Sequence, residues 1–387
     1  MNLRWSVLPL ALLIFGCSSS SVKFMVNAES FLHDELFPSH HSIKIETEEE
    51  VFALSDEMKS FVDNNVIHER TPVAQIKTLS HGIFQNSDIG IRYQNDANTI
   101  AADTFANGTA NCLSLTIMTY ALADYAGLGV EFQQVNVPEF WIRRDGASIL
   151  NRHINLKLYY KGRDVETLFT RQAYTVDFND VSGTTDFSKS GISKARVLSL
   201  FYNNKGVDYF LIEDFDSAYA YFKKGIYVDP SLSDSYTNLG VLYRRLGEDE
   251  KAELVYHQAL AIAPEDNTTL ENLATLFRAT DRQVDADEIE RQLRSKRRTN
   301  PYYHYLLGQQ ALERKQLNKA RMHFSRAINL HDKNHEFYYA MARTMFLLGE
   351  KKASERYMNL ALRYSESKSD ELRYQYKLDS YSQLDKR

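Results

Sequence analysis

Hydrophobic and polar residues follow two different periods before residue 199. Three stretches carry apolar residues at the spacing of a helix: 51–66, 93–106 and 113–126. Three later stretches alternate apolar and polar residues as strands do: 130–132, 154–158 and 173–178. Lys161-Gly162 suits a hairpin turn between the last two stretches. This order predicts an α+β domain over residues 51–198, with helices first and an antiparallel sheet after them.

A third period, of 34 residues, begins at Ser199. Position 8 of this period is always small: Gly206, Gly240, Ala274, Gly308 and Ala342. Position 24 is aromatic in all but the third repeat, which has Glu290: Phe222, Tyr256, Phe324 and, one residue early, Tyr357. A small residue lets two helices approach closely, and an aromatic side chain fills the gap between neighbouring helix pairs. This is the tetratricopeptide pattern, and it predicts an all-α solenoid of five repeats over 199–368, followed by a capping helix over 369–387.

The composition narrows the class of protein. Of 387 residues, 43% are hydrophobic and 25% are charged, which excludes a disordered chain. The formal net charge is -5, whereas proteins that bind nucleic acid are usually basic. The two cysteines, Cys17 and Cys112, are too few for a disulfide framework. We expect no nucleic-acid partner and no cofactor.

The first cysteine follows a short apolar run. The run ends at Phe15 and has 11 residues, whereas a transmembrane helix needs about 20. It predicts a signal peptide over residues 1–16. The stretch Ile14-Phe15-Gly16-Cys17 resembles a bacterial lipobox, which implies lipidation of the cysteine and a stable anchor in the cell envelope. The serine after the cysteine favours the outer membrane, with the protein facing the periplasm. The alternative is an ordinary cleaved signal peptide.

Residues 17–50 are interpreted as the lipidated cysteine and a solvated linker. His33, His40 and His41 lie close together in it, and four glutamates follow before residue 51. A metal site is conceivable, but these histidines have neither helical nor zinc-like spacing. The glutamates suit the start of the next helix, because a helix N-terminus favours negative charge.

The second cysteine lies where a helix is predicted to begin. Asn111 is a good N-cap, which places Cys112 in the first turn of the third predicted helix. Backbone N–H groups there favour a thiolate and can also stabilise an oxyanion. His153 stands at the start of a predicted strand and Asp177 near the end of the next. In this order Cys112 is the candidate nucleophile, His153 the general base and Asp177 the group that orients the imidazole.

These residues and their order resemble the transglutaminase-like domain of the papain-type superfamily over about residues 90–180. The resemblance implies thiol acyl transfer on a carboxamide: peptide hydrolysis, deamidation or cross-linking. The stretch between His153 and Asp177 is longer than the short hairpin of that family, so Asp164 and Glu166 are rivals for the third residue. With its lipobox and its repeats, the chain resembles bacterial envelope lipoproteins of this two-domain layout.

The repeats predict a protein or peptide partner. The first helix of each repeat usually lines the concave groove, where the sequence places Arg244, Arg278 and Arg343. Such a groove would suit an acidic or C-terminal peptide segment. The sequence therefore predicts a lipid-anchored periplasmic protein whose Cys-His-Asp domain acts on peptide-like amides and whose solenoid binds protein. The alternative is a non-catalytic scaffold in which both domains only bind partners.

Overall fold

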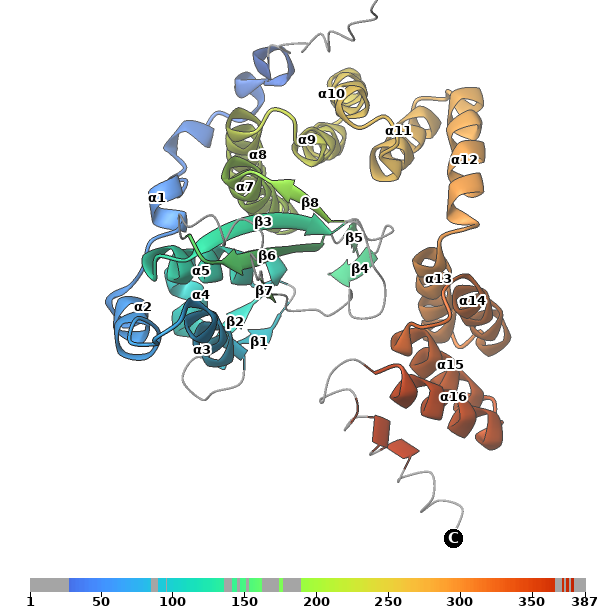
Figure 1. Ribbon diagram of the computed structural model, residues 1–387. Helices are drawn as coiled ribbons and strands as arrows, with labels where there is room; N and C mark the ends of the chain where they lie inside the picture. The colour runs from blue at the N-terminus through green and yellow to red at the C-terminus, as the bar shows by residue number, and fades with distance from the viewer. Residues whose placement is uncertain are drawn as a thin grey trace, which may run out of the picture.

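The computed structural model describes residues 28–84, 90–94, 96–135, 141–144, 147–150, 153–161, 174–176 and 189–365, with 371, 374, 375, 377 and 378 near the C-terminus. An α+β region is followed by a row of paired helices, which curves around one side of it (Figure 1). Within the described residues, no helix is both long and apolar enough to cross a bilayer.

The α+β region combines short helices with a small sheet. Its helices are α1 (Glu48–Val51), α2 (Asp56–Phe61), the π-helical turn η4 (Val62–Val66), α3 (Pro72–Phe84), α4 (Ala101–Asn107) and α5 (Cys112–Tyr125). Its strands are β1 (Arg92–Tyr93), β2 (Thr109–Ala110), β3 (Gly129–Val135), β4 (Trp141–Arg144), β5 (Ala147–Leu150), β6 (His153–Tyr159), β7 (Tyr174–Val176) and β8 (Lys189–Ile192). The order β7-β6-β3-β8 forms an antiparallel sheet, β4 and β5 form a hairpin, and β1 pairs in parallel with β2.

Helix α5 is the centre of the α+β core. Eleven of its 14 residues are buried, and a helix that is buried all round needs neighbours on every side. It packs against β3, β6, α2, α4 and α7. The ring of Tyr120 on α5 stacks on that of Phe132 on β3, with the ring centroids 4.9 Å apart. The prediction of a helix over 113–126 is confirmed.

Two other helix predictions are partly wrong. Tyr93 belongs to β1, and α4 begins only at Ala101, because the chain between them follows the start of α5 instead of coiling. There the Asn111 N–H donates to the carbonyl of Ala97. The stretch 51–66 is interrupted after α1, and Ser55 then caps α2 by accepting a hydrogen bond from its backbone. Strands β3, β6 and β7 confirm the three predicted strands, whereas the sequence pattern gave no sign of α3 or β8.

Residues 194–363, all described, form five helix pairs. The first helices of the pairs are α7 (Lys194–Leu211), α9 (Ser233–Arg245), α11 (Asn267–Ala279), α13 (Pro301–Glu313) and α15 (His335–Leu347). The second helices are α8 (Phe215–Val228), α10 (Asp249–Ile262), α12 (Gln283–Arg297), α14 (Leu317–Leu330) and α16 (Lys351–Arg363).

The 34-residue period corresponds to one repeated contact. A Cβ atom on Gly240 would lie 2.5 Å from the ring of Tyr256, so no larger residue fits there without moving the ring. The same two positions bring together Gly206 with Phe222 and Gly308 with Phe324. The predicted close approach at position 8 is therefore confirmed in three repeats, and the aromatic ring of position 24 packs there against the glycine of its own helix pair.

The row of helices has a weak joint between its third and fourth pairs. Successive helices pack closely from α7 to α12 and again from α13 to α16, whereas α12 and α13 make few contacts. Helix α12 buries only Ala286 and Leu293. Glu290, which replaces the aromatic residue of the pattern, forms an ion pair with Arg278. Among the described residues, one hydrophobic cluster extends as far as α12 and separate clusters begin at α13.

The first helices face the α+β region. Helices α7, α9 and α11 contact one another in an inner row, which lies toward the sheet in Figure 1. Helix α13 contacts β4. Because the β4–β5 hairpin is inserted between β3 and β6, the end of the sheet where β3 finishes and β6 begins lies toward the fourth helix pair.

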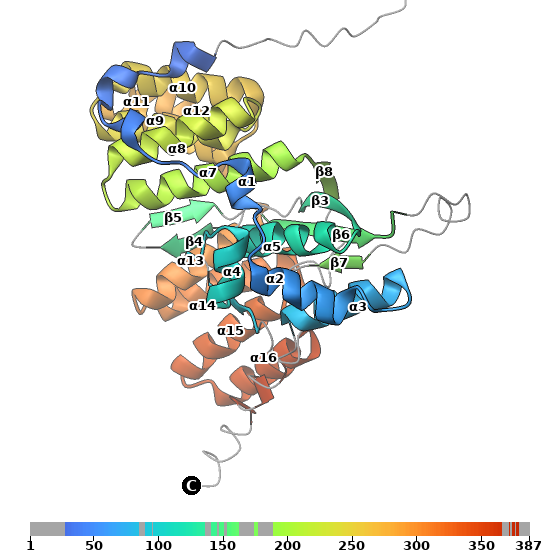
Figure 2. The same cartoon turned by 90° about the vertical axis from the view of Figure 1, so that its left-hand side faces the viewer.

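The segment before α1 is packed, so the expectation of a solvated linker over 17–50 is wrong for the residues of it that are described. It forms three short 3-10 helices: η1 (Ala28–Phe31), η2 (Asp34–Leu36) and η3 (His40–Ser42). Phe37 is 1% exposed and stacks on Tyr219, and Phe31 packs edge-on against Tyr236. Here η1 contacts α10 and η3 contacts α8, so the segment lies over part of the second helices, which form the outer row of the repeats; Figure 2 shows it passing over α8 to α1.

Residues from the C-terminal end pack on the fifth pair. Tyr374 is fully buried and its hydroxyl lies 2.7 Å from Nδ1 of His335. Tyr374 and Leu378 belong to one hydrophobic cluster with Tyr338 and Met358. These contacts cover the apolar end of α15 and α16, although most of the stretch 369–387, predicted as a capping helix, lies outside the described residues.

Candidate functional site

The start of α5 has the geometry that the sequence predicts. Gly108 ends α4 in the left-handed conformation, with φ of 62°. Asn111 then caps α5, its Oδ1 accepting a hydrogen bond of 2.8 Å from the Ser114 N–H. Cys112 is the first residue of the helix and is 8% exposed. Its sulfur therefore belongs to the turn whose N–H groups point out of the helix end, where an anion is stabilised.

The chain on either side holds this helix end in place. Ser114 Oγ donates to the carbonyl of Ala97 at 2.7 Å and accepts from the Thr99 N–H at 2.9 Å. Thr116 Oγ1 donates to the carbonyl of Cys112 at 2.7 Å. The backbone around Cys112 is thus fixed by hydrogen bonds that the thiol does not make itself.

The fold brings His153 and Cys112 to the same end of the two packed layers formed by helix α5 and the β7-β6-β3-β8 sheet. Helix α5 ends at Tyr125 and β3 begins at Gly129, so the strand runs back along the helix. Fourteen helical residues and seven strand residues both span about 20 Å, which puts the end of β3 level with the start of α5. His153, the first residue of β6, pairs with Val135, the last residue of β3.

His153 lies on the face of the sheet away from α5. Phe132, which stacks on Tyr120 of α5, pairs with Leu156, so that residue and its alternates face the helix. His153 alternates with them and shares the other face with Asn155 and Gln133. All three are buried, at 5%, 1% and 3% exposure. Cys112 and His153 thus reach the same end of the layer from opposite faces, beside a set of buried polar side chains.

The third residue of the predicted site is not located. Strand β7 pairs with β6 through Val176 and Leu156, and Asp177 is the next residue in the chain. Asp177 and its rivals Asp164 and Glu166 lie outside the described residues.

The three candidate groove arginines do not form one described cluster. Arg278 forms an ion pair with Glu290, so its charge is already compensated. Arg244 is half-buried at the end of α9, and Arg343 is exposed on α15. The weak joint after α12 separates Arg343 from the other two.

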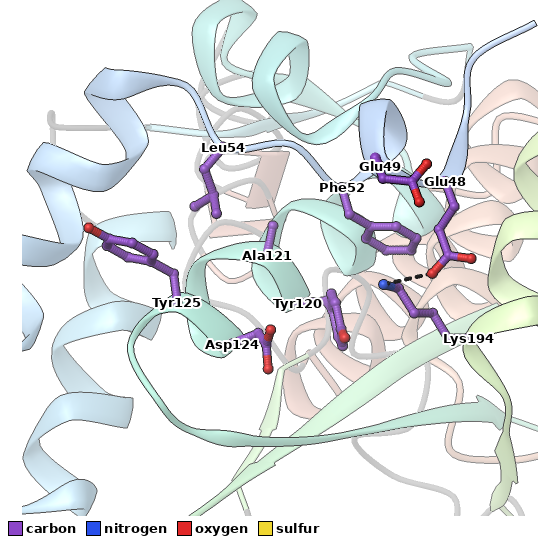
Figure 3. Close-up of a pocket in the computed structure, with 9 residues that line it drawn as sticks. All are labelled: Glu48, Glu49, Phe52, Leu54, Tyr120, Ala121, Asp124, Tyr125 and Lys194. Carbon is purple, nitrogen blue, oxygen red and sulfur yellow. Dashed lines mark ion pairs between the residues drawn. The ribbon is translucent and has the colours of Figure 1, made fainter.

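A pocket of about 350 Å³, which sequence reasoning missed, lies among α1, α5 and α7 (Figure 3). Lys194 lies 4.4 Å from the ring centroid of Phe52 and 5.1 Å from that of Tyr120. It also forms an ion pair of 2.9 Å with Glu48. Although burial by itself lowers the Lys194 pKa, the hydrogen bond to Glu48 helps to raise it above its ordinary value. The lining residues from α5 begin at Tyr120, two turns from Cys112, so this pocket is separate from the thiol site.

Family models match the first two repeats. The tetratricopeptide repeat family matches residues 200–232 and again residues 235–268. The chain contains tetratricopeptide repeats. These matches confirm the repeats where the sequence pattern is strongest, and no curated protein matches the chain.

Solved structures resemble about half of the chain at low identity. Pseudomonas aeruginosa PilF is 18% identical, covering 50% of this chain and 92% of its own, with a TM-score of 0.27. YrrB, described as a TPR protein with an unusual peptide-binding site, is 14% identical, covering 46% of this chain and 92% of its own, at 0.25. MamA is 18% identical, covering 44% of this chain and 94% of its own, also at 0.25. These scores are too low to assign a shared overall arrangement.

Proposed function

We propose that this protein binds a protein partner through the inner row of its tetratricopeptide repeats. The observation that carries the proposal is the pair of family matches, because such repeats stack into extended concave binding surfaces. The segment 28–46 lies on the second helices α8 and α10 and also reaches the first helices: Phe31 packs on Tyr236 of α9, and the Tyr202 hydroxyl of α7 donates to the carbonyl of Glu46.

Site-specific photo-crosslinking tests which face binds. A crosslinking residue replaces Thr275 on α11, in the inner row, and in a matched variant replaces Leu254, which is 48% exposed on α10 in the outer row. We expect a discrete crosslinked species from position 275 alone. The same species from both positions, or from position 254 alone, would contradict binding by the inner row.

A second proposal is thiol acyl chemistry at Cys112, supported by the arrival of Cys112 and His153 at one end of the layer. The thiolate attacks the carbonyl carbon of a carboxamide, and backbone N–H groups at the start of α5 stabilise the oxyanion. The C–N bond breaks, the amine leaves with a proton from the imidazolium of His153, and a thioester remains on Cys112. Water or a second amine then releases the acyl group. The proposed role of Asp177, with Asp164 and Glu166 as rivals, is to orient the imidazole.

An activated ester tests this chemistry without knowledge of the substrate. Incubation with p-nitrophenyl acetate should add one acetyl group to Cys112, seen by intact mass and peptide mapping, and Cys112→Ala should abolish it. His153→Ala should slow the acylation by about 10²-fold or more, whereas the control His68→Ala, at an exposed position, should not. A Cys112 that never acquires the acyl group would favour the non-catalytic scaffold.

A third proposal is the address: a lipid-anchored envelope protein, held at the outer membrane through Cys17 and facing the periplasm. The lipobox-like stretch before Cys17 supports it. Ten residues lie between Cys17 and the packed segment that begins at residue 28. Fully extended, a chain of that length spans at most about 35–40 Å. An anchor there would keep the first repeats close to the membrane surface. Metabolic labelling with a fatty acid should label the protein, and the Cys17→Ser variant should lose the label; equal labelling of both would refute the anchor.

A further inference from the structure

Asp34, His40 and His41 bring three potential metal ligands together on the outer face of the first repeat. One ligand atom of each lies within 4.8 Å of the other two. The buried His40 places its Nδ1 2.7 Å from the carbonyl oxygen of Phe37 and its Nε2 3.4 Å from the Asp34 carboxylate. A proton on Nδ1 would be used by the carbonyl and would leave the Nε2 lone pair available. Metal-binding histidines are commonly held by such a backbone hydrogen bond.

A positive charge already occupies the space between these groups. Lys223 Nζ lies 2.6 and 2.8 Å from the two carboxylate oxygens of Asp34 and 3.4 Å from Nε2 of His40. The Tyr219 hydroxyl donates to the same carboxylate at 2.7 Å. Burial by itself raises the pKa of Asp34, but the hydrogen bonds from Lys223 and Tyr219 outweigh it and the pKa lies below its ordinary value.

We propose that Asp34, His40 and His41 bind a divalent transition-metal ion, with Zn²⁺ as the best fit, in place of the Lys223 ammonium group. Two imidazoles and one carboxylate are ligands that Zn²⁺ accepts, with water in the fourth position. Lys223 can leave because its ammonium group sits on a flexible four-carbon stem. All three ligands belong to η2 and η3, so the ion would fasten these two turns together.

Because Lys223 competes with the ion for the same ligands, the proposal predicts in which direction each substitution changes the affinity for Zn²⁺. Lys223→Met keeps most of the aliphatic stem and removes the competing charge, so it should raise the affinity for Zn²⁺ several-fold. His41→Ala should weaken binding by at least about tenfold, and because His41 is exposed its loss leaves the packing of Phe31 and Phe37 intact. His40→Ala and Asp34→Asn should weaken binding as well.

The measurement is a titration of the untagged full chain with Zn²⁺ by calorimetry, repeated with Co²⁺ to record its ligand-field absorption. The control is His257→Ala on α10, where an exposed histidine lies 3.6 Å from Glu253 and, among the described residues, belongs to no group of three potential ligands; it should not change the affinity. One ion per chain, with the stated order of affinities, supports the site. Binding that is unchanged in His41→Ala, or weaker in Lys223→Met, would overturn it, and so would the absence of stoichiometric binding to a correctly folded chain.

Discussion

Helices α5 and α12 are of similar length and are built very differently. Eleven of the 14 residues of α5 are buried, whereas α12, with 15 residues, buries two. In the α+β region a single enclosed helix carries the core, and its neighbours are strands and helices from distant stretches of the sequence. In the repeats each helix packs mainly on helices that are near it in the sequence, and the same contact between a glycine and an aromatic ring occurs in three of the five repeats. In the third repeat Glu290 replaces the aromatic residue, and there an ion pair with Arg278 joins the two helices of the pair.

The largest effect is expected at position 24 of the repeats. Phe324 is fully buried on α14. Phe324→Ala should lower the free energy of local unfolding of the α13–α14 pair by about 3–5 kcal/mol. Glu290→Ala, at the same position of the third repeat, removes only a partly exposed ion pair and should cost less than about 1 kcal/mol.

Native-state hydrogen exchange of the full chain measures both variants. Because α12 and α13 make few contacts, faster exchange in Phe324→Ala should be confined to α13–α16. Equal loosening of α7–α11 would mean that the repeats form one continuous unit, and the weak joint would be wrong.

A leucine pair compares the two regions directly. Leu122 is fully buried on α5, and Leu122→Ala should lower the free energy of unfolding by about 2–5 kcal/mol. Leu254 is 48% exposed on α10, and Leu254→Ala should change stability by no more than about 0.5 kcal/mol. Urea unfolding followed by circular dichroism gives both values. Similar losses would show that α5 is not the centre of the core.

Two glycines in the second repeat separate close packing from backbone strain. Gly240→Leu must displace the ring of Tyr256 and should cost about 1–3 kcal/mol or more. At Gly247, with φ of 81°, a side chain would meet nothing within 4 Å, so Gly247→Leu should cost only about 1 kcal/mol of backbone strain. Thermal unfolding ranks the stability of the two variants. Equal losses of stability would show that the 34-residue register has been assigned incorrectly.

The repeats over 199–368 could be predicted in more detail because the same residue types recur at the same positions of the 34-residue period. Gly206, Gly240 and Gly308 all face the ring 16 residues later, so the small residue allows the close approach that the spacing predicts, whereas the ring packs within its own pair and not between pairs. The departure from the pattern at Glu290 is visible in the sequence. The weak joint, however, depends on how α12 packs against α13. No pattern within one helix encodes that contact.

The α+β half was less predictable because its contacts join distant residues. Local signals sufficed for α5, where Asn111 caps the helix, and for β3, β6 and β7. They failed in the first part of 93–106, before α4, where the backbone hydrogen-bonds to the residues around the start of α5 instead of forming a helix. The segment before α1 reads as a polar linker, yet Phe31 and Phe37 bury themselves on the repeats. The common end of Cys112 and His153 follows from topology, whereas the opposite faces they approach from required the strand register.

The claim that one measurement tests most directly is the proposed action of His153 on the Cys112 thiol. With Cys17→Ser, Cys112 is the only thiol in the chain, and its rate of alkylation by iodoacetamide can be followed against pH. The account predicts that the folded chain is alkylated faster at neutral pH than the same chain after denaturation, because the backbone N–H groups at the start of α5 stabilise negative charge on the sulfur. His153→Ala should slow the alkylation near neutral pH, and Asp177→Asn should slow it less, with Asp164→Asn and Glu166→Gln as comparisons for the third residue. A Cys112 that reacts only after denaturation, at a rate that His153→Ala leaves unchanged, would contradict the claim.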